Sequence, residues 1–303
     1  MKIKNILCGV LCLLCLCLNA KDKKNVLFIL VDDFGWMDTG YNGSTFYETP
    51  ELDQLSKEFM RFDFCYTPSP MCSPTRVSIM TGKNPARHGV TQWLPGSSKW
   101  PKHPGEHQRV LCPAPAVKGL NKNETTLGEA LQQNGYKTAF YGKWHMGKFA
   151  KIGGPVNHGF ESQLAVIEEN SCSMFYPFRN HPKYFPEAKK GDNFTDLLTN
   201  NAIKFIDKNR EKPFFLYLAH FAMHTPIASK GYLRDKFEKK RHDMKLPADY
   251  KMSRDDYAHK QYNTLQNSAE YAGELATLDK NIGRLINHLK AKKLLDNTIV
   301  IIT

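Results

Sequence analysis

Residues 26–35 read Val-Leu-Phe-Ile-Leu-Val-Asp-Asp-Phe-Gly, an apolar run that ends on two adjacent carboxylates. Six consecutive apolar residues followed by polar ones predict a fully buried strand of the kind found in parallel sheets. Ligands collect at the carboxyl ends of the strands in such sheets. Two ionised carboxylates side by side favour a hard divalent cation, so Asp32 and Asp33 are candidate metal ligands. An exposed turn or a helix cap explains an Asp-Asp pair equally well.

The same alternation of apolar runs and helical patterns continues outward from this strand. Further strands are predicted over residues 136–141, 213–218 and 297–303, the last of them a buried-type strand. Helices are predicted from Thr49 and Pro50 to residue 60, from near Cys72, from near Thr126 to Gly135, and within residues 255–290. Residues 94–123 and 227–251 read as irregular insertions. The alternation is the βαβα pattern of an α/β fold.

The amino terminus has the layout of a secretory signal peptide over residues 1–20. Lys2 and Lys4 precede an apolar run over residues 6–18, and the segment closes on the small residue Ala20. Such a run is too short for a stable membrane span. We therefore expect export, to the periplasm or the extracellular space, or to the lysosome or the outside of a eukaryotic cell, with no stable membrane anchor. The mature part, residues 21–303, reads as one catalytic domain.

The chain is basic and carries few cysteines beyond this leader. Its formal net charge is +12, which favours an anionic substrate or surface. No helix-turn-helix, finger or RNA-binding signature is visible, so no nucleic-acid partner is expected. The remaining cysteines are Cys65, Cys72, Cys112 and Cys172. Their spacing is not that of a zinc site, and two disulfides are possible in an oxidising compartment.

The surroundings of Cys72 point to another fate for that residue. Residues 72–82 read Cys-Ser-Pro-Thr-Arg-Val-Ser-Ile-Met-Thr-Gly. A helix beginning near this cysteine, with Arg76 close by, favours an anionic group. The segment resembles the signature of the formylglycine-dependent type I sulfatases, Cys-X-Pro-X-Arg followed by Thr-Gly. The resemblance implies that a formylglycine-generating or anaerobic maturation enzyme oxidises Cys72 to formylglycine (3-oxoalanine), whose hydrate is the nucleophile.

Two further segments are similar to sulfatase motifs. Residues 135–145 end on Gly-Lys-Trp-His, and the resemblance implies that Lys143 binds sulfate oxygens and that His145 accepts a proton from the formylglycine hydrate. His224 stands two residues before a proline, in the position of the family's His-X-Pro, where it would protonate the leaving oxygen. His220, at the end of a predicted strand, reads as a packed residue.

Together these motifs imply the fold and chemistry of an arylsulfatase-like member of the alkaline phosphatase superfamily. The implied fold is a central mixed sheet flanked by helices. The implied reaction is hydrolysis of sulfuric esters by the nucleophile derived from Cys72. A Ca²⁺ or Mg²⁺ ion would be held by Asp32, Asp33 and the modified Cys72. Phosphodiesterases and phosphomutases of the superfamily use Ser or Thr as nucleophile, so Cys72 and Arg76 argue against them.

The resemblance stops at the last predicted strand. In the family that strand runs into Ser-Asp-Asn-Gly or Ser-Asp-His-Gly, which completes the metal site, and the C-terminal part of the fold follows. Neither is present in residues 1–303. We therefore expect weak metal binding and little or no turnover from this chain by itself. The non-enzymatic alternative is an inactive homologue that at most binds sulfated glycan.

The substrate class is suggested by aromatic and cationic residues over positions 92–118, at the first insertion. Trp93, Trp100 and Arg109 would suit a sulfated sugar, since rings stack on aromatic faces and cations meet sulfates. The basic residues of the second insertion would extend this subsite, although a solvated surface explains them equally well; they are Lys230, Arg234, Lys236, Lys239, Lys240 and Arg241. Sulfated carbohydrate is the first expectation, and a simple aryl sulfate is the second.

Overall fold

The computed structural model describes residues 23–94, 117–168, 172–178, 182–248 and 265–303. The predicted signal peptide over residues 1–20, together with Trp100, Arg109 and Cys112, lies outside the described residues. Among the helices that are described, none is both long and apolar enough to cross a membrane.

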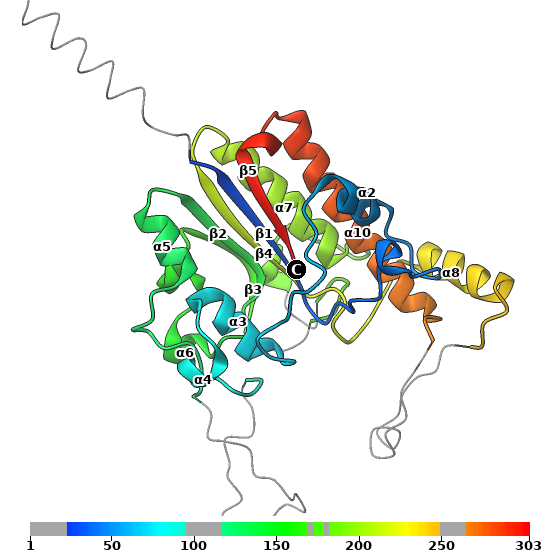
Figure 1. Ribbon diagram of the computed structural model, residues 1–303, viewed down its shortest axis with the longest axis horizontal. Helices are drawn as coiled ribbons and strands as arrows, with labels where there is room; N and C mark the ends of the chain where they lie inside the picture. Colours follow the sequence, from blue (N-terminus) through cyan, green and yellow to red (C-terminus); the bar gives the residue numbers. More distant parts are fainter. Residues whose placement is uncertain (1–22, 95–116, 169–171, 179–181, 249–264) are drawn as a thin grey trace, which may run out of the picture.

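A five-stranded sheet forms the centre of the molecule, with the strand order β3-β2-β4-β1-β5 (Figure 1). The strands are β1 (Asn25–Val31), β2 (Lys137–Lys143), β3 (Ser162–Ile167), β4 (Phe214–His220) and β5 (Thr298–Ile302). All four pairings between them are parallel. The carboxyl ends of β2, β4 and β1 are therefore neighbours at one edge of the sheet.

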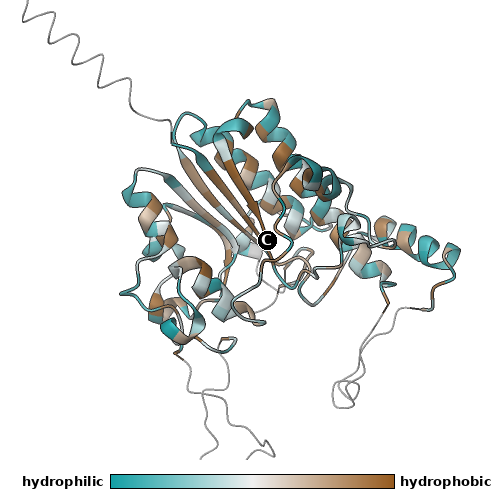
Figure 2. Cartoon of the chain, in the orientation of Figure 1, coloured by the Kyte–Doolittle hydropathy of each residue, from teal (hydrophilic) through white to brown (hydrophobic). Residues whose placement is uncertain are grey.

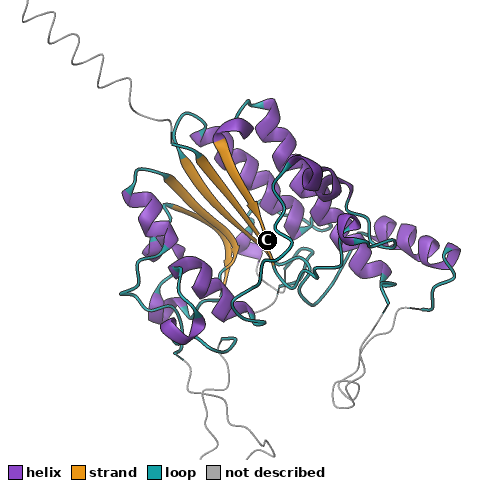
Figure 3. Ribbon diagram, viewed as in Figure 1, coloured by secondary structure: helices purple, strands orange, loops and turns teal. Residues whose placement is uncertain are grey.

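Helices cover both faces of this sheet, and each interface buries its own apolar core (Figures 1 and 3). One face carries α2 (Pro50–Glu58), α7 (Phe194–Asn209), α8 (Gly231–Asp243) and α10 (Ala269–Ala291). The other carries α3 (Cys72–Thr81), α4 (Pro85–His88), α5 (Leu127–Gln133) and α6 (Phe149–Ile152). Short 3₁₀ turns complete the elements: η1 (Gly40–Asn42), η2 (Pro155–His158), η3 (Pro182–Tyr184) and η4 (Leu295–Asn297). Figure 2 shows the strands as the most hydrophobic elements, between helices with polar outer faces.

The predicted α/β class, with a central sheet flanked by helices, is confirmed, and most of the predicted elements are present. Pro50 stands at the first position of α2, and Thr126 caps α5 through a capping box with Glu129. β2 and β4 each extend two residues beyond their predicted ends, to Lys143 and His220.

Three expectations about elements were wrong. Neither β3 nor α7 was predicted from the sequence. The start of α7 nevertheless has a local signal, because Asn193 caps it by accepting hydrogen bonds from the N–H groups of Thr195 and Asp196. Residues 227–251 are not wholly irregular, because α8 occupies their middle. β5 is not a fully buried strand: it lies at the edge of the sheet, with Ile299 49% and Ile301 40% exposed.

Candidate active site

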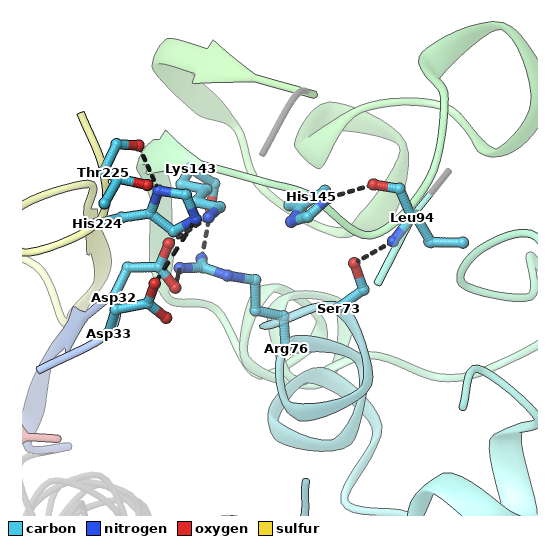
Figure 4. A network of polar contacts seen from close by, with 9 residues as sticks. All are labelled: Asp32, Asp33, Ser73, Arg76, Leu94, Lys143, His145, His224 and Thr225. Atoms are coloured by element: carbon cyan, nitrogen blue, oxygen red, sulfur yellow. Dashed lines mark hydrogen bonds and ion pairs between the residues drawn. The ribbon is translucent and has the colours of Figure 1, made fainter. Parts of the chain in front are cut away.

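The carboxyl ends of three neighbouring strands bring the predicted site residues together (Figure 4). Asp32 follows β1 directly, Lys143 is the last residue of β2, and His224 stands four residues after β4. The chain end Thr303 lies beside them, since its carbonyl accepts a hydrogen bond of 2.8 Å from the N–H of Val31. The edge of the sheet is thus the place where a ligand is expected in this class of fold.

Asp32, Arg76 and Lys143 form a buried charge cluster, with exposed fractions of 6%, 2% and 0%. Arg76 Nη2 lies 3.1 Å from Asp32 Oδ1, and Lys143 Nζ donates a hydrogen bond to Asp32 Oδ2. Burial acts to raise the pKa of Asp32, but the charges of Arg76 and Lys143 outweigh it and hold that pKa at about 2. The cluster therefore contains an ionised carboxylate and two cations.

Arg76 retains a donor for a further ligand. Its Nη1 donates to the carbonyl of Lys143 at 2.7 Å and its Nη2 faces Asp32 Oδ1, whereas Nε is buried without a hydrogen-bond partner among the described residues. A buried guanidinium N–H group without an acceptor is costly. An anion placed at this group would satisfy it.

Gly142 explains how Lys143 reaches this cluster. The pairing of β2 with β3 shifts register between Tyr141 and Lys143, which marks a bulge. Gly142 has a φ of +103°, and a Cβ atom there would lie 2.0 Å from the carbonyl oxygen of Ala219 on β4. Only glycine lets the strand turn this close to its neighbour, so the glycine of the Gly-Lys-Trp-His segment has a steric reason.

Cys72 is the first residue of α3, and Arg76 lies one helical turn further on. The Cys72 thiol is free and partly exposed, and it contributes to the electrostatic field at Lys143. Cys65, by contrast, carries an exposed free thiol well outside this cluster in the sequence. A nucleophile derived from Cys72 would stand at the positive end of the helix dipole.

His145 lies beside the cluster in a constrained, buried position. It is 1% exposed, and its φ of 47° is in the left-handed region. Burial, together with the charge of Lys143, lowers the pKa of His145 to about 4, so the ring is neutral at pH 7. Its Nε2 donates a hydrogen bond to the carbonyl of Leu94. A neutral buried imidazole of this kind can accept a proton.

His224 faces Asp33 at the outer side of the site. Its Nε2 lies 3.6 Å from Asp33 Oδ2, and its Nδ1 lies 2.6 Å from the carbonyl of Thr225 and donates to it. Asp33 is 60% exposed and has a φ of 55°. His220 is different: it is 1% exposed inside the core, as expected of a packed residue, and burial lowers its pKa to about 4.

The donor chemistry of this site fits a hard divalent cation in kind but not in number. Asp32 and Asp33 supply carboxylate oxygens, which such cations prefer, yet both oxygens of Asp32 already face Arg76 or Lys143. Within the described ranges, no group of three or more His, Cys, Asp or Glu side chains is arranged to hold a metal ion. The described residues would therefore supply only part of a calcium coordination shell.

The predicted substrate residues are only partly accounted for. Trp93 is 46% exposed, while Trp100 and Arg109 lie outside the described residues. The basic stretch in residues 230–241 is largely neutralised by ion pairs: Lys230 with Asp196, Arg234 with Asp235, Lys236 and Lys240 with Glu48, Lys239 with Asp243, and Arg241 with Glu238. The structural interpretation of that stretch is therefore favoured over a glycan subsite.

Sequence reasoning missed two residues near the site. Trp36 follows Asp33 by three positions and is 67% exposed, so it offers an aromatic surface close in sequence to the Asp-Asp pair; that closeness in sequence was the available signal. Ser73 occupies a variable position of the Cys-X-Pro-X-Arg pattern, so the pattern itself gave no reason to single it out. It is fully buried and accepts a hydrogen bond from the N–H of Leu94.

Comparisons with known proteins agree with this geometry. Residues 24–303 match the family described as Sulfatase. The chain is 28% identical to the N-acetylgalactosamine-6-sulfatase of Mus musculus over 94% of its own length and 50% of that protein. It is 31% identical to Arylsulfatase G of Homo sapiens, over 70% of this chain and 44% of that protein. The chain thus spans about half the length of the curated relatives it matches.

Solved structures show the same relationship. The crystal structure of Ps i-CgsB matches with a TM-score of 0.66 and 26% identity, over 92% of this chain and 57% of that one. The same protein has also been solved in complex with k-i-k-neocarrahexaose. Since the family match covers nearly the whole described chain, the protein belongs to the sulfatase family.

Proposed function

We propose that this protein hydrolyses sulfate esters through a formylglycine derived from Cys72. The observation that carries the proposal is the convergence of Arg76 and Lys143 on the start of the helix that begins at Cys72. A nucleophile at a helix N-terminus beside two buried cations suits attack on an anionic group. Membership of the sulfatase family supports sulfate as that group.

The two cations would bind and orient the sulfate. The unpartnered Nε of Arg76 points to a ligand that accepts hydrogen bonds, and Lys143 adds a point charge. Both side chains are held by Asp32, which fixes their position before substrate arrives. Fixed charges of this kind stabilise the charge that develops in the transition state.

The two histidines would take opposite roles in proton transfer. His224 is partly exposed and its Nε2 lies 3.6 Å from Asp33 Oδ2 at the outer side of the site, where it would donate a proton to the departing alcohol. His145 is neutral and buried, and would accept a proton at residue 72 so that sulfate can leave. The different environments of the two rings support this division.

Formylglycine and a divalent metal ion would supply the nucleophile and the Lewis acid of the proposed reaction. Formylglycine, as its hydrate, would supply one hydroxyl that attacks sulfur and a second whose deprotonation regenerates the aldehyde. A Ca²⁺ or Mg²⁺ ion bound by Asp32, Asp33 and residue 72 would add Lewis-acid charge at the sulfate. Because calcium takes six or more oxygen ligands, we expect weak binding where these residues act alone.

A sulfated carbohydrate is the proposed substrate class. One matched relative is named for a sulfated amino sugar, and a solved relative was studied with a neocarrahexaose. The exposed rings of Trp93 and Trp36 would offer stacking surfaces for a sugar. Aryl sulfate is the alternative, because Arylsulfatase G is also among the relatives.

Mass spectrometry of the peptide containing Cys72 tests the nucleophile directly. After coexpression with a formylglycine-generating enzyme, we expect conversion of Cys72 to formylglycine, with Cys65 unmodified as the internal control. Sulfate release should then be compared for sulfated monosaccharides, 4-nitrophenyl sulfate and a phosphonate monoester. Unmodified Cys72 under these conditions would count against the proposal, as would hydrolysis of the phosphonate without any sulfate release.

A further inference from the structure

The peptide groups of Leu94 connect two residues of the proposed site that are distant in sequence (Figure 4). The N–H of Leu94 donates a hydrogen bond of 3.0 Å to Ser73 Oγ. The carbonyl of the same residue accepts a hydrogen bond from His145 Nε2. Leu94 therefore links the second residue of α3 to the residue proposed to accept a proton.

The direction of these bonds fixes the tautomer of His145. A carbonyl oxygen has no proton to donate, so Nε2 must carry the hydrogen in the bond to Leu94. In a neutral imidazole the other nitrogen, Nδ1, then holds a lone pair. Nδ1 is buried and has no hydrogen-bond partner among the described residues. It is the nitrogen that remains able to accept a proton.

The position of Leu94 depends on Ser73. Ser73 is 0% exposed and stands in the first turn of α3, next to Cys72, with its hydroxyl accepting the hydrogen bond from Leu94. Leu94 itself is 6% exposed, so both of its peptide hydrogen bonds lie in a buried setting. The bond to Ser73 thus anchors the carbonyl that orients the His145 ring.

We propose that Ser73 is a positioning residue for His145: acting through Leu94, it holds the imidazole with its proton on Nε2 and leaves Nδ1 as the proton acceptor. The chemical meaning of this role rests on the proposed sulfatase function. The hydrogen-bond relay itself does not, because it involves neither the modification of Cys72 nor a metal. Ser73 would thereby place the proton acceptor relative to the nucleophile that adjoins it in sequence.

Nuclear magnetic resonance of the full chain with ¹⁵N-labelled histidine tests the relay without any turnover. Long-range ¹H–¹⁵N correlations report which ring nitrogen carries the proton, and His145→Gln identifies the signal by its loss. We expect His145 as the Nε2–H tautomer, with an Nε2 proton that exchanges slowly with water. In Ser73→Ala, loss of the bond to Leu94 should accelerate that exchange about tenfold or more.

The chain offers a matched control on the same helix. Ser78 is also buried in α3, and its hydroxyl lies 3.0 Å from Nε2 of His88, whose Nδ1 accepts from the N–H of Val90. Ser78→Ala should therefore accelerate exchange at His88 and leave His145 unchanged, while Ser73→Ala should do the reverse. Each variant removes one buried hydroxyl from α3, so a general loosening of the helix would affect both histidines in both variants.

Three results would overturn the proposal. They are a wild-type His145 protonated on Nδ1, an unchanged His145 exchange rate in Ser73→Ala, and equal acceleration at His145 in Ser78→Ala. These outcomes are independent of the mass of the Cys72 peptide and of sulfate release. Failure of the relay can therefore be told apart from failure of the proposed function.

Discussion

Asp32 and Asp33 are neighbours in the chain but occupy opposite environments. Asp32 is 6% exposed and lies between Arg76 and Lys143, whereas Asp33 is 60% exposed and its carboxylate lies 3.6 Å from His224. The φ of 55° at Asp33 turns the chain away from β1 and separates the two carboxylates. One carboxylate holds the cations of the site together, and the other remains available to a ligand.

This difference gives opposite expectations for two otherwise identical substitutions. Asp32→Asn would leave Arg76 and Lys143 buried without a counter-charge, and we expect it to destabilise the fold by about 3–5 kcal/mol. Asp33→Asn, as the control, should cost about 0.5 kcal/mol or less because its pair with His224 is exposed. Urea unfolding of both variants gives the comparison, and equal losses would show that the buried charge cluster contributes nothing.

His220 should make the stability of the protein depend on pH. Its pKa is about 4 in the folded chain and near 6.5 in an unfolded one, so only the unfolded chain takes up a proton as pH falls below 6.5. Stability should therefore fall by about 1.4 kcal/mol per pH unit between pH 6.5 and 4. Above pH 6.5 both states are neutral and the effect vanishes.

His220→Gln removes this titration. The difference in unfolding free energy between pH 7.5 and 5.5 should shrink by about 1.4 kcal/mol in this variant. His242→Gln serves as the control, because it removes an imidazole that is 90% exposed instead of a buried one. An undiminished pH dependence in His220→Gln would mean that the buried ring is not the source.

Among the helices and strands, those with a strong local sequence pattern could be predicted, whereas those that depend on tertiary contacts could not. The apolar runs of β1 and β4 and the start of α5 near Thr126 are encoded in a few adjacent residues, so sequence alone predicted them. α8 was read as irregular because its mean composition is polar and charged, and its one buried residue, Phe237, gives little periodicity. The helix is held by tertiary contacts that no local window contains: Phe237 is buried beside Phe46, α8 packs against α10, and two of its lysines pair with Glu48 on the segment before α2.

The same distinction applies to the candidate site. The resemblance to sulfatase motifs indicated Cys72, Arg76, Lys143, His145 and His224, and the strand that ends on two carboxylates indicated the aspartates. Their separation into a buried cluster around Asp32 and an exposed pair at Asp33 depends on which strands are neighbours, and it was not predicted. Leu94 and Ser73 escaped notice because backbone groups and a small hydroxyl carry no signature in a sequence.

Gly142 is the element-scale position where a single methyl group should do the most damage. Gly142→Ala combines a φ of +103° with a Cβ only 2.0 Å from the Ala219 carbonyl, and we expect a loss of about 3 kcal/mol or more. Gly82→Ala is the control: Gly82 has a φ of +66° but nothing within 4 Å, so strain alone should cost about 1 kcal/mol. Thermal unfolding of the two variants distinguishes the steric clash with Ala219 from the backbone strain of a positive φ. Similar losses of stability in both variants would contradict the close approach of β2 and β4.

For the whole molecule, the two faces of the sheet are covered unequally near β5. Val300 and Ile302 pack against the core beneath α10 and its neighbours, while Ile299 and Ile301 point to the opposite face and remain 49% and 40% exposed. Four large side chains in the segment between α2 and α3 are more exposed still: Met60 82%, Phe62 71%, Phe64 87% and Tyr66 84%. Exposed apolar surface at an edge strand favours association between chains.

We therefore expect the described chain to self-associate with rising concentration, and β5 to contribute. Ile299→Lys and Ile301→Lys together should raise the concentration at which light scattering begins, because charged side chains on an edge strand oppose pairing with another strand. The variant Gln132→Lys adds charge at an exposed site of α5 and should have a smaller effect. It therefore distinguishes the effect of charge on the edge strand from the effect of a further increase in the net charge, which is already +12. A chain that stays monomeric at all concentrations would show that the exposed side chains of β5 are tolerated as ordinary surface. If the paired substitution leaves the scattering unchanged, the association would instead be attributed to the exposed aromatic segment between α2 and α3.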